Sequence, residues 1–250
     1  MILPTTKSPP ERKSPRLLVI FSKPKIGKTT AFAELEDTLI IDLEQGALYL
    51  ESMKVDVKSI ALAEGKSDFQ VLGEVIHAIQ AGTVDGKKPY KRVVIDTVTA
   101  LEDMVHGYAK VLYNNTPMGA NYKGDILKLP NGGGYLYLRE AFFNTLNMIY
   151  PLADEIILSG HLKDTTIEKD GKEIAVKELD LTGKIKSLLS AKVDAIGLLY
   201  REENKCILSF NTSDTIVCGA RPDHLKNKEI VLTELVDGKI KSNWNQIYID

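Results

Sequence analysis

The sequence predicts an α/β fold: a mostly parallel central sheet flanked by helices, with antiparallel strands near the C-terminus. Short apolar runs that end in polar residues alternate with stretches of helical periodicity, which is the pattern of a parallel sheet with crossover helices. These runs are residues 17–21, 39–43, 92–97 and 155–159. Three later runs are separated by turns rather than helices, which favours antiparallel closing strands. They are residues 193–201, 205–210 and 216–219.

Length and composition fit one globular domain preceded by an arm. The 250 residues are 44% hydrophobic and 26% charged, ordinary values for a domain of this size. Residues 1–15 contain four prolines and no apolar pattern, so we expect a flexible N-terminal arm, or one that docks onto a neighbouring subunit. Residues 16–250 are expected to form a single domain.

The charge and cysteine content narrow the class of protein. A formal net charge of −2 excludes a strongly cationic nucleic-acid binder, so any DNA contact would come from a local patch or from several subunits together. Cys206 and Cys218 lie in apolar surroundings, and we interpret them as buried thiols of a reducing cytosol. The absence of a long apolar run or a hydrophobic signal core predicts a cytoplasmic protein without membrane contact.

The first strand leads into a candidate phosphate-binding loop. The stretch RLLVIFSKPKIGKTT, residues 16–30, passes from an apolar strand through a Ser-Lys-Pro-Lys turn into Gly27-Lys28-Thr29 and a short helix. Such a turn aims backbone N–H groups and a helix N-terminus at a triphosphate. We therefore expect Lys28 to reach the β and γ phosphates of ATP and the Thr29 hydroxyl to bind Mg²⁺.

Nine residues make up this candidate loop, which we call the phosphate loop. They are Ser22, Lys23, Pro24, Lys25, Ile26, Gly27, Lys28, Thr29 and Thr30. The usual pattern has a glycine where this chain has Ser22, so we expect the first turn of the loop to differ slightly. Since Gly-Lys-Thr alone is a common tripeptide, the interpretation depends on the acidic residues that follow.

Two acidic residues end the next apolar runs. Glu44 follows the run 39–43, and a glutamate there could polarise the water that attacks the γ-phosphate, or merely cap the next turn. Asp96 ends the run 92–97, where its carboxylate could orient the water shell of Mg²⁺ beside Thr29. Together with the phosphate loop, they predict a nucleotide site at the carboxyl ends of the strands.

The middle of the chain alternates helices with an irregular insert. Residues 57–62 are predicted as a short edge strand, 68–81 as a helix, 82–91 as a loop and 99–112 as an amphipathic helix. Residues 113–134 are rich in Asn, Gly and Pro, with lysines and tyrosines interleaved. Such an insert suits a strand of nucleic acid, although a mobile loop without a ligand gives the same pattern.

A helix over residues 135–150 precedes the run 155–159, which ends at Gly160-His161. His161 could donate a hydrogen bond to the γ-phosphate or relay its presence to the next loop, although a single histidine is often inert. Residues 164–182 read as a charged hairpin around Asp170-Gly171, followed by a helix over 184–191 and a final strand over 230–235.

With these motifs set out, the sequence resembles the RecA-type core ATPases, and most closely the compact phage-encoded RecA-like single-strand annealing proteins. The resemblance covers residues 16–235 and depends on SKPKIGKTT, IIDLEQGA, VVIDTVTAL, LSGHLKD and GKIKSLLSAKVDAIGLL, in that order. It implies a sheet in which the strand ending at Ser159 lies between the phosphate-loop strand and the strand ending at Asp96.

The resemblance also implies roles for single residues. Lys28 and Thr29 would bind phosphate and Mg²⁺, Glu44 would activate water, Asp96 would support the metal and His161 would occupy the sensor position. Two departures, Ser22 in the loop and a histidine in place of the RecA glutamine, predict weak hydrolysis with nucleotide binding retained.

RecA-like cores assemble head to tail into rings or filaments, with ATP between subunits and a basic residue entering from the neighbour. The resemblance makes Arg221 the candidate for that residue, with Lys226 and Lys228 behind it. A surface arginine after a strand is the alternative interpretation.

These expectations give one leading function and two competitors. The leading function is ATP-dependent binding of single-stranded DNA in phage recombination or annealing, in the host cytoplasm. It predicts slow hydrolysis that DNA stimulates, and a single-strand-binding protein as a further partner. The first competitor is a nucleotide-dependent assembly protein with a protein partner and no DNA role. The second, a small-molecule kinase, is disfavoured because few arginines lie near the site.

Overall fold

The computed structural model describes residues 3, 5–169 and 172–249. Its strands are β1 (Leu17–Ser22), β2 (Thr38–Asp42), β3 (Lys54–Asp56), β4 (Arg92–Asp96), β5 (Glu155–Lys169), β6 (Lys172–Leu179), β7 (Ala195–Glu202), β8 (Lys205–Ser209), β9 (Gly219–Ala220), β10 (Glu229–Val236) and β11 (Lys239–Ser242). Its α-helices are α1 (Lys28–Ala33), α2 (Val57–Glu64), α3 (Asp68–Ala81), α4 (Val98–Met104), α5 (His106–Asn114), α6 (Gly134–Ile149) and α7 (Gly183–Lys192). Short 3₁₀ turns are η1 (Ile126–Lys128), η2 (Pro130–Gly132) and η3 (Trp244–Gln246).

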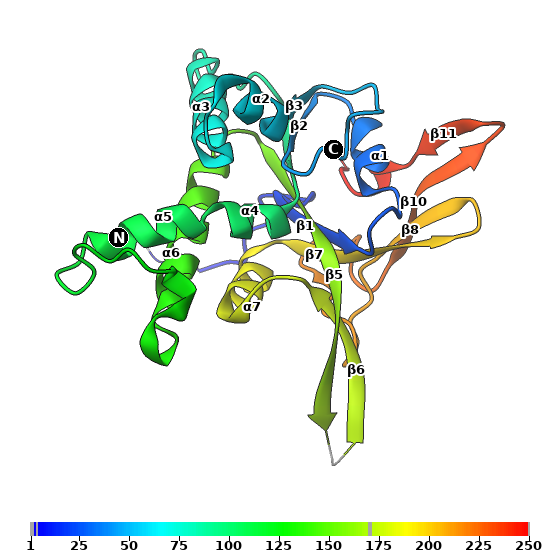
Figure 1. Ribbon diagram of the computed structural model, residues 1–250. Helices are drawn as coiled ribbons and strands as arrows, with labels where there is room; N and C mark the ends of the chain where they lie inside the picture. Colours follow the sequence, from blue (N-terminus) through cyan, green and yellow to red (C-terminus); the bar gives the residue numbers. More distant parts are fainter. Residues whose placement is uncertain (1–2, 4, 170–171, 250) are drawn as a thin grey trace.

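The strands form one mixed sheet with a parallel centre. Its order is β11-β10-β8-β7-β1-β5-β4-β2-β3, with β6 paired to β5 and β9 paired to β7. Strands β7, β1, β5, β4, β2 and β3 run parallel, while β8, β10 and β11 are antiparallel (Figure 1). The predicted fold class is therefore confirmed, as is the place of β5 between β1 and β4.

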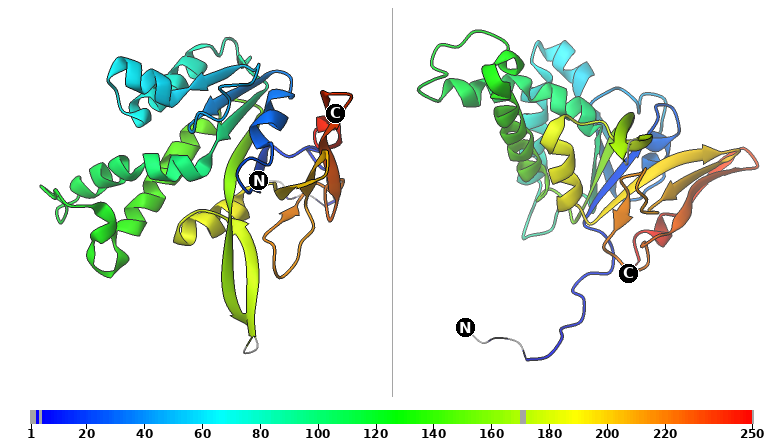
Figure 2. Two further views of the ribbon diagram at one scale, coloured as in Figure 1. Left: turned by 45° about the vertical axis from the view of Figure 1, so that its right-hand side comes forward. Right: turned by 90° about the horizontal axis from the view of Figure 1, so that it is seen from below.

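Alternation along the buried strands produces a core on each face of the sheet. Val19 and Phe21 of β1 pack with the face covered by α2–α7, whereas Leu18 and Ile20 pack with α1 and the C-terminal segment. Figures 1 and 2 show helices α2–α7 gathered beside one face of the parallel strands, with α1 beside the other. Because both faces are covered, the carboxyl ends of the strands are left as the accessible edge.

Two predicted elements of the N-terminal half are wrong. Residues 57–62 form helix α2 rather than an edge strand, because the Asp56 side chain accepts a hydrogen bond from Ser59 N and caps a helix. The edge strand is β3, just before it. The single helix predicted over 99–112 is two helices, α4 and α5, which meet at Val105.

The strand predicted over 155–159 does not end at its polar tip. It continues as β5 to Lys169 and pairs antiparallel with β6 in a long hairpin that projects from the body (Figures 1 and 2). The predicted arms of the hairpin are confirmed, while its turn at Asp170-Gly171 lies outside the described residues. As a result, His161 lies within a strand instead of on a loop.

The insert and the C-terminus are more ordered than the sequence indicates. Residues 113–134 complete α5 and form η1 and η2, with Ile126 buried and the Lys110 ammonium donating to the Lys123 carbonyl. The strand predicted over 216–219 is reduced to β9, and β11 and η3 extend the C-terminal part.

The N-terminal segment lies on the surface and contacts the body of the protein at Ser14. Residues 5–13 are exposed and form no helix or strand, whereas the Ser14 hydroxyl donates to the Ile249 carbonyl at 2.6 Å. Across the described part of the chain, no helix combines the length and the apolar character needed to cross a membrane.

Candidate functional site

The phosphate loop connects β1 to α1 at the carboxyl edge of the parallel strands. Its sharp turns occur at Lys25, with φ of 63°, and at Gly27, with φ of 113°. The Gly27 carbonyl then accepts from Ala31 N at 3.0 Å and starts α1. Ser22 belongs to β1, and its φ is not among the positive values, so the position needs no glycine. The expected difference in the first turn of the loop stays a prediction.

Ser22 instead bonds to the lysine of the loop. The Lys28 ammonium donates to Ser22 Oγ at 2.9 Å, and both side chains are buried. Burial lowers the pKa of Lys28, and this effect outweighs the raising influence of the Asp96 and Glu44 carboxylates. A desolvated ammonium with one neutral partner favours an approaching anion, which is what a phosphate-binding lysine needs.

Thr29 and Asp96 lie together as the sequence predicts. Thr29 Oγ1 donates to Asp96 Oδ2 at 2.6 Å, and burial raises the pKa of Asp96. Gly46 lies opposite, where a Cβ would come within 3.2 Å of Thr29 Oγ1. A hydroxyl, a carboxylate and free space beside them are the hard oxygen donors and the room that Mg²⁺ requires, so these residues fit the metal.

The loop after β2 is organised by Asp42, which the sequence analysis did not single out. Its carboxylate accepts from the backbone N–H groups of Glu44, Gly46 and Ala47 at 3.0, 3.1 and 2.7 Å. The Lys54 ammonium holds the next turn through the carbonyls of Ala47 and Leu50. These bonds fix Glu44 at the sheet edge, and a buried aspartate just before a polar turn was the available signal.

Glu44 and His161 are partners. His161 Nε2 lies 3.1 and 3.0 Å from the two Glu44 carboxylate oxygens, although the residues come from β5 and from the loop after β2. The hydrogen bond to His161 is the main cause that lowers the pKa of Glu44, against the raising effect of burial. The carboxylate therefore stays ionised at neutral pH, but both of its oxygens lie within hydrogen-bond distance of His161.

The backbone of His161 links this site to the hairpin. His161 N donates to Thr99 Oγ1 at 3.2 Å, and the His161 carbonyl accepts from Asp180 N at 2.9 Å. The Thr99 hydroxyl also donates to the Asp180 carbonyl. The base of the β5–β6 hairpin is thus tied to the residue that contacts Glu44.

One cavity of about 320 Å³ joins most of the predicted site residues. Its lining comprises Pro24, Lys25, Gly27, Lys28, Thr29, Thr30, Glu44, Gly46, Asp96, Thr97 and His161. Of these, the sequence analysis did not identify Gly46 or Thr97. Ser22 lies beneath the cavity at Lys28, and Lys23 and Ile26 of the phosphate loop do not line it.

The Ile26 carbonyl is held from the other side of the loop. It accepts from the Arg201 guanidinium at 3.1 Å and from the buried Cys206 thiol at 3.2 Å. Strands β7 and β8 therefore support the phosphate loop. Spacing along the sequence could not indicate this, because both partners lie more than 170 residues away from Ile26.

Arg221 is not brought to this cavity within the chain. Its guanidinium lies 3.2 Å from Asp194 Oδ1 and donates to the carbonyls of Ala191 and Lys192. Asp194 accepts from Leu17 N, at the amino end of β1. Arg221 consequently lies at the sheet edge opposite the phosphate loop.

A family model described as an AAA domain matches residues 14–222, a range that contains every residue of the cavity. A comparison with curated proteins gives no match.

Proposed function

The chain belongs to the AAA domain family, and from that premise we propose that it is an ATPase that binds Mg²⁺-ATP in the cavity at the phosphate loop and uses it to bind single-stranded DNA. The observation that carries the nucleotide part is the convergence of Lys28, Thr29, Glu44 and Asp96 on one cavity from three strand ends. Lys28 would bind phosphate, Thr29 and Asp96 would hold Mg²⁺, and Glu44 would activate water, which are the requirements of phosphoryl transfer.

Binding begins with the lysine. The Lys28 ammonium would exchange the Ser22 hydroxyl for charged phosphate oxygens, and no side chain caps the N-terminus of α1, where Lys28 lies. Thr29 and Asp96 would hold Mg²⁺, which neutralises charge on the β and γ phosphates when it is bound. Since Asp96 lies beside Thr29, its carboxylate would supply a second oxygen donor for the metal.

Hydrolysis depends on Glu44. This carboxylate is ionised and could polarise an attacking water, but its two oxygens face His161. The pair must open before Glu44 orients water toward a phosphate. Turnover is therefore slow in the isolated chain, and a ligand that moves His161 accelerates it.

The finer assignment to a RecA-like, phage recombination or annealing protein is supported by the strand order and by the resemblance of the motifs. Such proteins act as rings or filaments, and many weak phosphate contacts then add up along one strand. Arg221 faces away from its own cavity, so it could serve only the site of a neighbouring copy stacked head to tail.

The test is ATP turnover at low salt with and without single-stranded DNA. We expect stimulation by DNA in the wild type, loss of nucleotide binding in Lys28→Ala, and nucleotide binding without turnover in Glu44→Gln. Turnover that is equal with and without DNA would remove the DNA part of the proposal. Calorimetry that detects no ATP binding would remove all of it.

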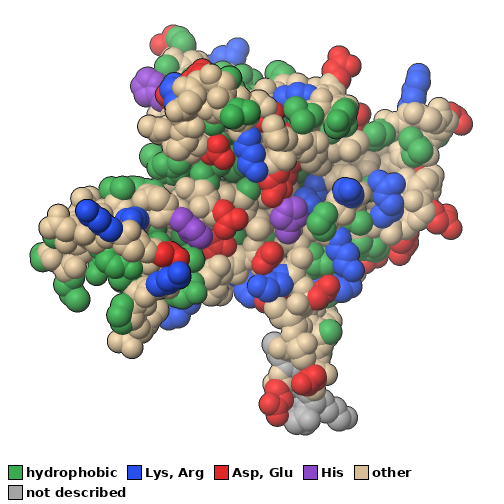
Figure 3. Space-filling model, viewed as in Figure 1, with side chains coloured by type: hydrophobic (Ala, Val, Ile, Leu, Met, Phe, Trp, Pro, Cys, Tyr) green, Lys and Arg blue, Asp and Glu red, His purple; other side chains and the backbone are tan. Residues whose placement is uncertain are grey.

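A second function is favoured by the surface next to the site. Leu48, Tyr49 and Met53 are 50%, 98% and 48% exposed, and they follow the Glu44 loop. Figure 3 shows basic and acidic side chains interspersed on one face rather than gathered into a large basic area. Both features suit a nucleotide-dependent assembly protein whose partner is a protein. Size-exclusion chromatography separates the two, since ATP alone would then produce the assembly and DNA would not change it.

A further inference from the structure

We propose that single-stranded nucleic acid binds in a second cavity, between η2, α6 and the start of α7, with Arg139 and Lys184 on its phosphates and Tyr135 against a base. This inference rests on the proposed function and gives it a site. The cavity has a volume of about 470 Å³, larger than the nucleotide cavity. It begins at the end of the insert, residues 113–134, in which lysines and tyrosines are interleaved.

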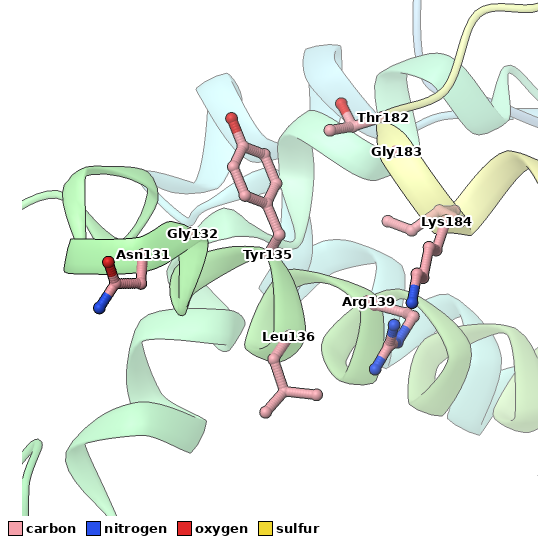
Figure 4. A pocket seen from close by; sticks show the side chains of 9 residues that line it. Asn131, Gly132, Tyr135, Leu136, Arg139, Thr182, Gly183 and Lys184 are labelled. Atoms are coloured by element: carbon pink, nitrogen blue, oxygen red, sulfur yellow. The ribbon is translucent and has the colours of Figure 1, made fainter.

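The walls come from two segments that are distant in the sequence. They consist of Asn131, Gly132, Tyr135, Leu136, Arg139, Thr182, Gly183, Lys184 and Ile185 (Figure 4). No acidic residue belongs to this set. The cavity is therefore suited to an anion by its charge, and it joins the insert region to the segment that follows the β5–β6 hairpin.

The two cations of the cavity lack counterions. Among the residues that the structure describes, neither the Arg139 nor the Lys184 side chain makes an ion pair or a hydrogen bond. Other lysines of α7 do have partners: Lys186 pairs with Glu178, and Lys192 donates to Asn147. Figure 4 shows Arg139 and Lys184 on the same side of the cavity. Two like charges that share a cavity repel each other, and a phosphate between them relieves that repulsion.

Tyr135 provides the second element of recognition. It precedes Arg139 by four residues on α6, and both residues line the cavity, with the Tyr135 ring on the side of Thr182 (Figure 4). Its side chain is 47% exposed, and the neighbouring Leu136 is 50% exposed. A half-exposed aromatic ring beside cations is the combination that binds an unpaired base and its phosphate. A small inorganic anion would leave the ring without a partner, and the bases of a duplex are not free to stack on it.

Hydrogen bonds of Thr182 and Asp180 connect the second cavity to His161 of the nucleotide site. Thr182 N donates to the buried Glu102 carboxylate at 3.0 Å, and Asp180 N, two residues earlier, donates to the His161 carbonyl. A strand that displaces Thr182 or Lys184 would therefore shift Asp180 and, through its hydrogen bond, the backbone of His161. This contact path is the physical reason to expect stimulation of turnover by the bound strand.

Fluorescence anisotropy with a labelled oligo-dT and a non-hydrolysable ATP analogue tests the site. We expect Arg139→Ala and Lys184→Ala each to weaken binding about three- to tenfold, and the double variant to reduce the salt slope of log K by about 1.4, or about 0.7 per lost phosphate contact. Tyr135→Ala should weaken binding about tenfold while Tyr135→Phe retains it, because the ring and not the hydroxyl stacks. Lys87→Ala, an exposed lysine on a loop elsewhere, is the matched control and should bind like the wild type.

The outcomes separate this site from the function itself. A wild-type protein that binds ATP but no oligonucleotide refutes the DNA function. Wild-type binding with an unchanged affinity and salt slope in the double variant refutes only the site. Competition by polyglutamate as strong as that by oligo-dT, with no effect of Tyr135→Ala, would indicate an acidic peptide and also overturn the site.

A second measurement does not depend on how well the variants fold. Photocrosslinking of an oligonucleotide that carries 5-iodouracil to the wild-type protein, followed by mass spectrometry, should label Tyr135. Labelling confined to other regions would overturn the proposal. Calorimetry with the ATP analogue confirms that each variant retains its nucleotide site.

Discussion

The negative charge on Asp96 lowers the stability of the folded protein. Its carboxylate is buried, burial raises its pKa, and the folded chain therefore becomes less stable as pH rises through its titration. We expect Asp96→Asn to raise the melting temperature of the nucleotide-free protein by about 2–4 °C, equivalent to about 1 kcal/mol for a chain of this size. Differential scanning fluorimetry would measure this shift.

The same variant should lose the stabilisation that Mg²⁺-ATP gives to the wild type, because the neutral amide is a poorer metal partner. Thr29→Ser, which keeps the hydroxyl beside Asp96, is the control that should retain it. If Asp96→Asn lowers the melting temperature and keeps the response to Mg²⁺-ATP, Asp96 has a structural role instead.

His161 controls the ionisation of Glu44. Its hydrogen bond is the largest cause that lowers the pKa of Glu44, so His161→Ala should raise that pKa, while Thr97 and Lys28 still lower it against the effect of burial. Because turnover requires the ionised carboxylate, the acid limb of the turnover profile should move to higher pH in the variant, measured between about pH 4 and pH 8. An acid limb that stays in place would mean that Glu44 is not the titrating group, and Glu44→Gln should lack turnover throughout.

At the scale of elements, the contact between α6 and the insert depends on one glycine. A Cβ at Gly134 would lie 1.8 Å from the Ile126 carbonyl oxygen of η1, and relieving that clash would require the backbone to shift rather than a flexible side chain. Gly134→Ala should therefore lower the free energy of unfolding by about 1–3 kcal/mol, as overpacked sites do. Urea unfolding followed by circular dichroism measures the loss.

Gly73 offers a matched control for that substitution. It lies inside α3, where an added Cβ meets nothing within 4 Å. Gly73→Ala should raise stability by roughly 0.5–1 kcal/mol, because alanine favours the helix. An equal effect of the two substitutions would contradict the close approach of η1 to α6.

The elements that sequence predicts best are those in which local pattern and burial agree. The strands β1, β2 and β4 are apolar runs that end in polar residues, and the same pattern places Lys28, Thr29 and Asp96 at one sheet edge. Residues 57–62 are mostly apolar, and their hydrophobic periodicity fits neither a helix nor a strand clearly. The N-cap at Asp56 therefore determines that they form a helix. The contacts of Asp42 are local, within five residues, and an aspartate before a polar turn is their signal. Arg201 contacts the Ile26 carbonyl from 175 residues away, and spacing along the sequence cannot indicate that contact.

The molecule as a whole has too little positive charge for one copy to bind DNA strongly. With a net charge of −2 and interspersed charges, a single chain offers a few phosphate contacts, among them the proposed pair in the second cavity. The DNA binding that we propose would then gain its affinity from several copies on one strand. With the ATP analogue present, oligonucleotides of about 60 nucleotides should bind more than about tenfold more tightly than those of about 10, beyond the gain from the number of sites.

The salt dependence of oligonucleotide binding tests the same prediction in a second way. The logarithm of the binding constant should fall linearly with the logarithm of the salt concentration between about 50 mM and about 200 mM, more steeply for the longer oligonucleotide because more phosphates are contacted. Lys28→Ala should remove the advantage of length, since nucleotide is proposed to order the contact between copies. If long and short strands bind alike, with one shallow salt slope, each chain acts alone, and the small net charge of the molecule then confines its hold on DNA to one weak site.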